Sequence, residues 1–260
     1  MRYLLLRSLP WLVGGLGVLC FEWTWSAPDS YPWFLCAPLA ALVVATFVIG
    51  WRKVSLAEII EKMTVPVIAY MAVALGALLV EQPAEQILIT ALGAGIPLLS
   101  LELLFLYAYQ PSRYPVNAIS RVNLALIPLS AFFLAEGLMG LRIFLTDPSW
   151  ESVADPVTVG SFAALGLVLA LLTSHPTSDR GHRLRWALFG ALLGIHIGIL
   201  CVIMPVALPV IGCVAALGLA APIRARRYGH DPKPPAKLAW VEGSMAFVFF
   251  LALLLVSRWA

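Results

Sequence analysis

Long runs of apolar residues, separated by charged or proline-rich breaks, dominate this sequence. A helix that crosses about 30 Å of hydrocarbon needs roughly 20 mostly apolar residues. The runs predict nine transmembrane helices, over Ser8–Phe21, Tyr31–Trp51, Thr64–Val80, Gln86–Tyr109, Val122–Leu141, Val157–Thr173, Trp186–Met204, Ala207–Pro222 and Leu238–Trp259. The seventh and eighth are predicted as two helices, because a single helix over both would reach about 55 Å. Pro205 and Pro209 also favour a tight turn between them.

The basic residues predict which way these spans run. If the N-terminus is cytoplasmic, all of the 17 Lys and Arg residues except Arg142 and Arg258 fall on the cytoplasmic side. Loops rich in Lys and Arg stay in the cytoplasm during membrane insertion. The sequence therefore predicts a cytoplasmic N-terminus and a C-terminus on the outer side.

Composition agrees with this membrane topology. The chain is 61% hydrophobic and 12% charged, with a mean hydropathy of +0.92, whereas soluble domains are about 45–50% apolar and about 25% charged. A soluble, disordered, collagen-like or disulfide-rich protein is excluded, and no loop is long enough for a soluble domain. We predict an all-α, polytopic integral membrane helical bundle, with residues 1–260 as a single transmembrane domain. The expected location is the cytoplasmic (inner) membrane of a prokaryote.

Three ionisable residues lie deep in the predicted spans: Glu102, Glu136 and His196. A charged side chain at the bilayer centre costs about 3 kcal/mol or more unless it is paired or hydrated, so each is a candidate for transport or proton coupling. Glu102 lies about 10 Å and Glu136 about 20 Å from the cytoplasmic end of its span, and neither has a basic residue at comparable depth. Both could equally be carboxyl groups that hydrogen-bond a neighbouring helix. Pro97 and Pro128 weaken the helices that carry them.

The cytoplasmic loops offer candidates for lipid headgroup binding. Two segments, Gln110–Arg121 and Ser174–Arg185, place arginines beside hydroxyl or amide side chains. A guanidinium binds phosphate through its planar fork, so the headgroup candidates are Arg113, Arg121, Arg180, Arg183 and Arg185. The favoured alternative is that these arginines only set the topology. In a third loop, Ser55 and Glu58 match a capping box, which predicts a short interfacial helix within Trp51–Met63 and a bend at Pro66.

Small residues point to close helix contacts. Gly190, Gly194 and Gly198 recur every four residues and predict a groove for another helix, in this chain or in a second copy. The four cysteines lie in or at the ends of spans and read as small core residues, although Cys20 and Cys36 could also pair.

The sequence contains no motif for metal, phosphate or nucleophilic chemistry, so no metal or cofactor is predicted and no nucleic-acid binding. No lysine lies in a span, which excludes a retinal Schiff base, and a lone mid-membrane histidine does not support haem ligation. Three functions stay open: a small secondary transporter or permease, a non-catalytic subunit or assembly factor of a membrane complex, and an enzyme acting on a lipid or isoprenoid. The buried acids favour the transporter. The expected partners are the lipid bilayer, a small-molecule, ion or lipid substrate, and further copies or other membrane subunits.

Overall fold

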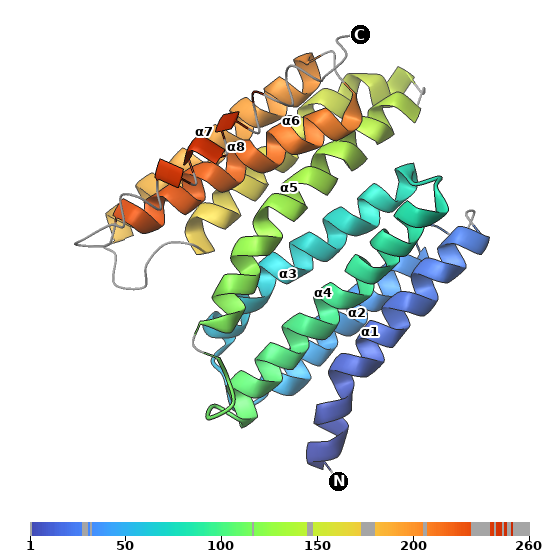
Figure 1. Cartoon of the computed structure of the whole chain (residues 1–260), viewed down its shortest axis with the longest axis vertical. Coiled ribbons are helices and arrows are strands. Elements are labelled where there is room, and N and C mark those ends of the chain that lie inside the picture. The colour runs from blue at the N-terminus through green and yellow to red at the C-terminus, as the bar shows by residue number, and fades with distance from the viewer. Residues whose placement is uncertain are drawn as a thin grey trace. The chain divides into compact units, whose positions relative to one another are not determined.

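A computed structural model describes residues 2–27, 31, 33–115, 117–144, 148–172, 180–204 and 207–229, and 240–241, 243–245, 247–248 and 251 in the C-terminal stretch. Of these residues, 91% are helical and none lies in a strand (Figure 1). The elements are α1 (Arg2–Ser26), α2 (Trp33–Gly50), α3 (Leu56–Gly76), the 3-10 helix η2 (Ala77–Leu79), α4 (Pro83–Tyr109), α5 (Ala118–Phe144), α6 (Pro148–Leu172), α7 (Arg180–Ile203) and α8 (Leu208–Gly229).

The helices follow the predicted spans. Among the described residues, α1 to α7 are long and apolar enough to cross a membrane, and α8 contains a shorter apolar stretch, Leu208–Pro222. The break that the sequence predicts before Ala207 is present between α7 and α8. The ninth predicted span, Leu238–Trp259, lies largely outside the described residues. The protein is thus an all-helical, multi-pass membrane protein, and the count of nine and the orientation stay predictions.

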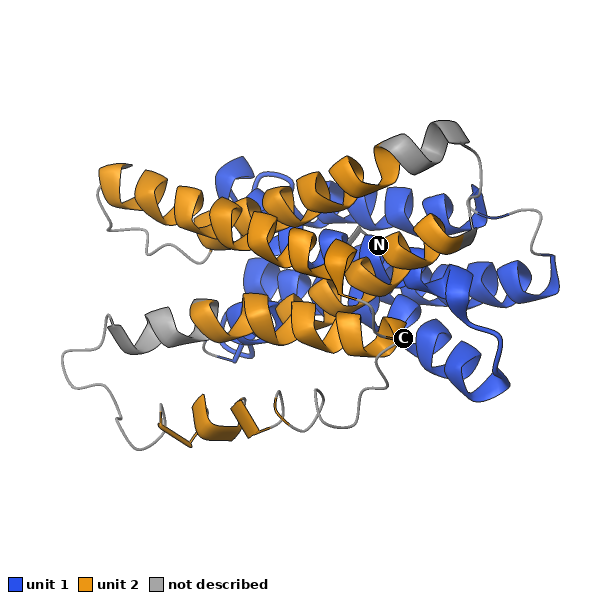
Figure 2. Ribbon diagram, turned by 90° about the horizontal axis from the view of Figure 1, so that it is seen from above, with its two compact units in different colours: residues 1–126 blue, residues 127–260 orange. Residues whose placement is uncertain are grey.

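The chain divides into two compact units, residues 1–126 and residues 127–260 (Figure 2). The first contains α1 to α4 and the beginning of α5, and the second contains the rest of α5 with α6, α7 and α8. In the first unit, α1 packs against α2 and α4, and α3 packs against the same two helices. In the second, α6 and α7 make the most extensive contact.

Glycines set the contact between α1 and α4. A Cβ atom on Gly17 would lie 3.2 Å from the Cα of Ala94, and one on Gly14 would lie 3.0 Å from the side chain of Leu98. In return, Gly93 of α4 makes room for the ring of Phe21, which is fully buried. The two helix backbones therefore lie close together along most of their length.

The start of α3 corrects one sequence prediction. The capping box of Ser55 and Glu58 is present, but it begins α3 itself, which runs unbroken through Pro66, so there is no separate interfacial helix. A proline leaves the carbonyl four residues earlier without its helical donor. Here the Nδ2 of Asn123 donates to the carbonyl oxygen of Lys62 at 3.0 Å, which replaces that donor.

The glycines of α7 pack against α6 of the same chain. A Cβ atom on Gly190 would lie 2.3 Å from the carbonyl oxygen of Gly166, and one on Gly194 would lie 2.0 Å from that of Phe162. Gly198 approaches the backbone of Val159 in the same way. The groove that the sequence predicts is therefore filled by a helix of this chain.

Arg142 connects three helices of the second unit. Its guanidinium holds Asp155 of α6 through two contacts, Nε to Oδ1 at 2.9 Å and Nη2 to Oδ2 at 3.3 Å. Its Nη1 donates to the carbonyl oxygen of Val202, near the end of α7, at 3.1 Å. The side chain of Arg142 on α5 thus contacts both α6 and α7.

We expect Gly194→Ala to lower the free energy of unfolding by about 1–3 kcal/mol, because the new methyl group collides with a backbone atom that cannot move away. Gly160→Ala is the matched control, since Gly160 lies on α6 with open space around it. Alanine favours helix over glycine, so this control should be neutral or stabilising. Unfolding of the two variants in detergent compares them, and equal stabilities would contradict the close contact.

Candidate functional site

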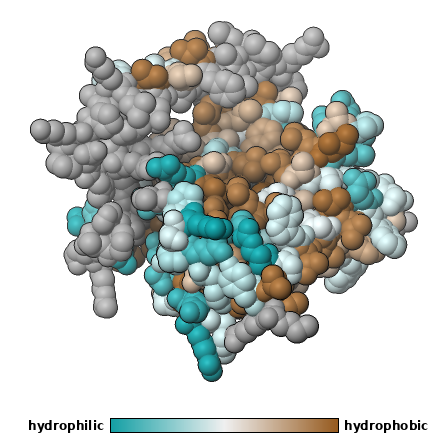
Figure 3. Space-filling model, turned by 60° about the horizontal axis from the view of Figure 1, so that its bottom comes forward, coloured by the Kyte–Doolittle hydropathy of each residue, from teal (hydrophilic) through white to brown (hydrophobic). Residues whose placement is uncertain are grey.

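An ion pair joins α1 to α4 in the first unit. The Nη1 of Arg7 donates to the Oε1 of Glu102. Seven residues separate Glu102 from the end of α4 at Tyr109, so the carboxyl group lies about 10 Å along the helix from that end. Figure 3 views the chain from this end, where hydrophilic side chains gather among hydrophobic ones.

The pair overturns the prediction that Glu102 has no basic partner at its depth. The first span was predicted to begin at Ser8, which left Arg7 in the cytoplasm, whereas α1 begins at Arg2 and includes Arg7. Since α1 and α4 run antiparallel, the start of one lies beside the end of the other. The apolar residues Leu4, Leu5 and Leu6 are the signal in the sequence that could have extended the span.

Aromatic rings surround the guanidinium side of the pair. Arg7 lies over the ring of Phe105, with 5.2 Å between the guanidinium carbon and the ring centroid. Phe105 stacks on Tyr109 at 5.2 Å, and Tyr3 of α1 contacts both rings. A cation over an aromatic face is attracted to its negative quadrupole, so these rings hold the arginine in place.

The other oxygen of Glu102 lacks a partner. Its Oε2 is buried and makes no hydrogen bond within the described part of the chain, although 23% of the whole side chain is exposed. Buried polar atoms are almost always hydrogen-bonded, so we expect this oxygen to have a partner in the working protein. A proton, a water molecule or a polar group of a ligand would satisfy this oxygen.

The other two predicted transport residues lie in the second unit. Glu136 is half-buried on α5, and it interacts with other groups of the protein. A Cβ atom on Gly212 of α8 would lie 3.1 Å from its side chain. His196 lies on an exposed face of α7, where its Nδ1 contacts the carbonyl oxygen of Leu192 at 2.7 Å.

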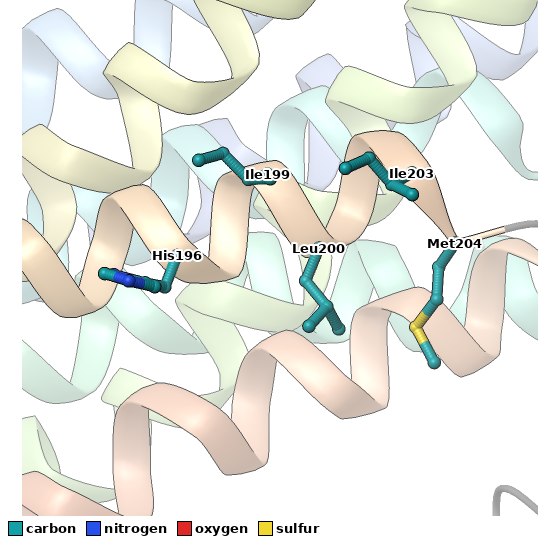
Figure 4. Close-up of a pocket in the computed structure, with 5 residues that line it drawn as sticks. All are labelled: His196, Ile199, Leu200, Ile203 and Met204. Carbon is teal, nitrogen blue, oxygen red and sulfur yellow. The ribbon is translucent and has the colours of Figure 1, made fainter.

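Among the described residues, His196, Ile199, Leu200, Ile203 and Met204 line a pocket of about 400 Å³ (Figure 4). Apart from the imidazole, all of these side chains are apolar. Neither Glu136 nor any other acid is among them.

The arginines predicted to bind headgroups differ in their surroundings. Arg113 and Arg121 are exposed. The Nε of Arg185 donates to the carbonyl oxygen of Gly181 at 3.3 Å, and Arg183 also has a partner. The side chain of Arg180 lies outside the described residues. Their role in headgroup binding stays a prediction.

Neither a disulfide bond nor a metal site is present in the described part of the chain. Cys20 and Cys36 are both free thiols. No three His, Cys, Asp or Glu side chains come together there in a way that could hold a metal ion. Beside Cys36, burial and the neighbouring thiol raise the pKa of Tyr31 to about 12, and its hydroxyl donates to the carbonyl oxygen of Ala74.

Comparison of the chain with known protein families, with characterised proteins and with solved structures found no match. Its own residues and geometry therefore carry the functional argument.

A double-mutant cycle tests the energetic link between Arg7 and Glu102. We expect Arg7→Met and Glu102→Gln to couple by about 1 kcal/mol, so that the double variant is more stable than the sum of the single effects predicts. The matched control pairs Glu102→Gln with Arg113→Met, which should add within about 0.5 kcal/mol. Additive effects for Arg7 and Glu102 in detergent unfolding would show that the pair contributes nothing.

Proposed function

We propose that this protein is a small proton-coupled secondary transporter and that the Arg7–Glu102 pair is its coupling site. Its helices are those of an integral multi-pass membrane protein. The observation that carries the proposal is a carboxyl group between two spans: one oxygen is paired to Arg7, and the other is buried without a hydrogen-bond partner among the residues that the structure describes.

Protonation of Glu102 is the coupling step. A proton that binds the carboxylate removes its negative charge and so removes the electrostatic attraction that holds Arg7. The guanidinium is then free to bind another anion. Loss of the proton restores the ion pair and displaces that anion. The site therefore binds a proton and a substrate together in one state and binds neither of them in the other.

This exchange suggests a substrate that carries a negative group. A guanidinium binds carboxylate and phosphate groups through two parallel hydrogen bonds, and such a group would occupy the place of the Glu102 carboxylate. A proton and a singly charged anion move together without net charge. The proposal is therefore a proton–anion symporter for small molecules.

The helices that carry the pair contain prolines close to it. Pro10 follows Arg7 by three residues in α1, and Pro97 precedes Glu102 by five residues in α4. Interrupted backbone hydrogen bonding beside a buried polar group is common in transporters, where it lets part of a helix move. These prolines support movement of the two helix segments that meet at the pair.

The remaining sequence predictions belong to the same proposal. The proposal keeps the predicted orientation, in which the asymmetry of basic residues favours a cytoplasmic N-terminus and so a cytoplasmic position for Arg7, and the predicted location in a prokaryotic inner membrane. A proton gradient across that membrane would drive uptake. Glu136 and His196 stay candidates for a proton path in the second unit.

Proteoliposomes containing the purified full chain and a pH-sensitive dye test the proposal. Inorganic phosphate, acetate, lactate and succinate are added outside in turn, and acidification of the lumen is recorded. We expect at least one anion to drive proton entry, and Glu102→Gln to slow that entry at least tenfold because glutamine cannot take up and release a proton. Glu102→Asp should retain part of the activity.

Glu85→Gln is the matched control, since Glu85 lies exposed in the first turn of the same helix. It should transport as the unaltered protein does. Full transport by a correctly inserted Glu102→Gln variant would contradict the coupling role. If no anion drives proton entry, the symporter proposal is wrong, and stable co-purification with other membrane chains would then favour the subunit function.

A further inference from the structure

The turn between α2 and α3 exposes two cations, Arg52 and Lys53, at the same end of the first unit as Arg7. Arg52 and Lys53 follow the last residue of α2, and both side chains are exposed. The turn is tight, because the backbone N–H groups of Lys53 and Val54 both donate to the carbonyl oxygen of Gly50 at 3.0 Å. Arg52 adopts a φ of 60°, a left-handed conformation that is uncommon for residues other than glycine. The turn thus fixes where both side chains begin.

Lys53 is further positioned by an aromatic ring. Its Nζ lies 5.9 Å from the ring centroid of Tyr109, on α4. Tyr109 stacks on Phe105 and meets Tyr3, whose hydroxyl accepts a hydrogen bond from the amide of Gln110. The ammonium group of Lys53 therefore lies over a ring, that of Tyr109, whose own position is held by two neighbouring rings.

No acid in the described part of the chain neutralises these two cations. Glu102 is bound by Arg7, and Glu58 accepts hydrogen bonds from Ser55 and from Tyr107. Neither Arg52 nor Lys53 forms an ion pair with a described acid. An exposed pair of positive charges of this kind is complementary to a phosphate group.

An apolar surface continues from the cations along α2. Val48 and Val44 are four residues apart on α2, so they lie on one face of the helix, and Trp51 follows the end of the helix; all three are exposed. Tryptophan prefers the boundary between headgroups and hydrocarbon. The face therefore offers positive charge, then an aromatic ring, then apolar side chains, which is the order of groups along a lipid.

We propose that Arg52 and Lys53, with Trp51, Tyr109 and the exposed face of α2, form a binding site for an anionic phospholipid. The two cations bind the phosphate, whose negative charge no ammonium group offsets in an anionic phospholipid, and one acyl chain lies along Val48 and Val44. This lipid site does not rest on the transport proposal, although Tyr109 also belongs to the group of rings beside Arg7. Its residues also differ from the headgroup candidates named from the sequence, such as Arg121, for which a role in topology alone was favoured.

Native mass spectrometry of the purified full chain, titrated with phosphatidylglycerol or phosphatidylcholine, tests the site. We expect phosphatidylglycerol to bind at least fivefold more tightly. Lys53→Gln and Arg52→Gln should each weaken its binding about fivefold, the effect of about 1 kcal/mol per basic residue near a membrane surface. Lys62→Gln is the matched control, because it removes the same charge from another lysine whose Nζ lies over an aromatic ring, 4.5 Å from the ring centroid of Tyr107, and it should change binding less than twofold.

Two further variants test the role of the ring. Tyr109→Phe keeps the face under Lys53 and should bind as the unaltered chain does, whereas Tyr109→Leu removes it and should weaken binding. Equal losses for Lys53→Gln and Lys62→Gln would overturn the site in favour of general surface charge. Equal binding of the two lipids, or displacement of the bound lipid by inorganic phosphate, would also overturn it.

Discussion

Close contact between helix backbones is the constraint on which both units depend. In a bilayer, helices gain little by hiding apolar side chains from one another, because the lipid tails are equally apolar. Association then relies on dispersion contacts and on the few polar groups that meet across helices. Gly14, Gly17 and Gly93 permit this approach between α1 and α4, and Gly166, Gly190 and Gly194 permit it between α6 and α7. The candidate pair of Arg7 and Glu102 exists only because the first of these contacts brings two spans together.

Polar groups in the chain are arranged around the same constraint. A backbone carbonyl without a donor is costly where no water is available, and Pro66 creates one at Lys62, which Asn123 satisfies. Arg142 likewise donates to a carbonyl near the end of α7 while it holds Asp155. Glu102 differs from these two residues, because one of its oxygens pairs with Arg7 of another span while the other is buried without a hydrogen-bond partner among the described residues.

Patterns within one helix predicted much of the fold. Apolar runs located eight helices, and the prolines near Pro205 located the break between α7 and α8. Ser55 with Glu58 located a helix start, although the helix predicted there was a separate interfacial one and not α3. Only one member of the candidate pair was predicted. The depth of Glu102 in its span singled this residue out, but its partner Arg7 was missed. Arg7 is 95 residues away along the chain. A contact over this distance depends on which helices become neighbours, and patterns within one helix do not contain that information. The position of Lys53 over Tyr109 depends on the same information, as does the role of Asn123.

The distance along the chain between Arg7 and Glu102 also bears on how the protein is made. Ribosomes add about 5–20 residues per second, so Glu102 is synthesised about 5–20 s after Arg7. During that interval α1 is in the membrane or at its surface with a charge that has no partner. Arg7 lies near one end of its helix, where a long basic side chain reaches the headgroups. Its place in α1 therefore keeps this charge near the headgroups until α4 has been synthesised, when Glu102 becomes available as its partner.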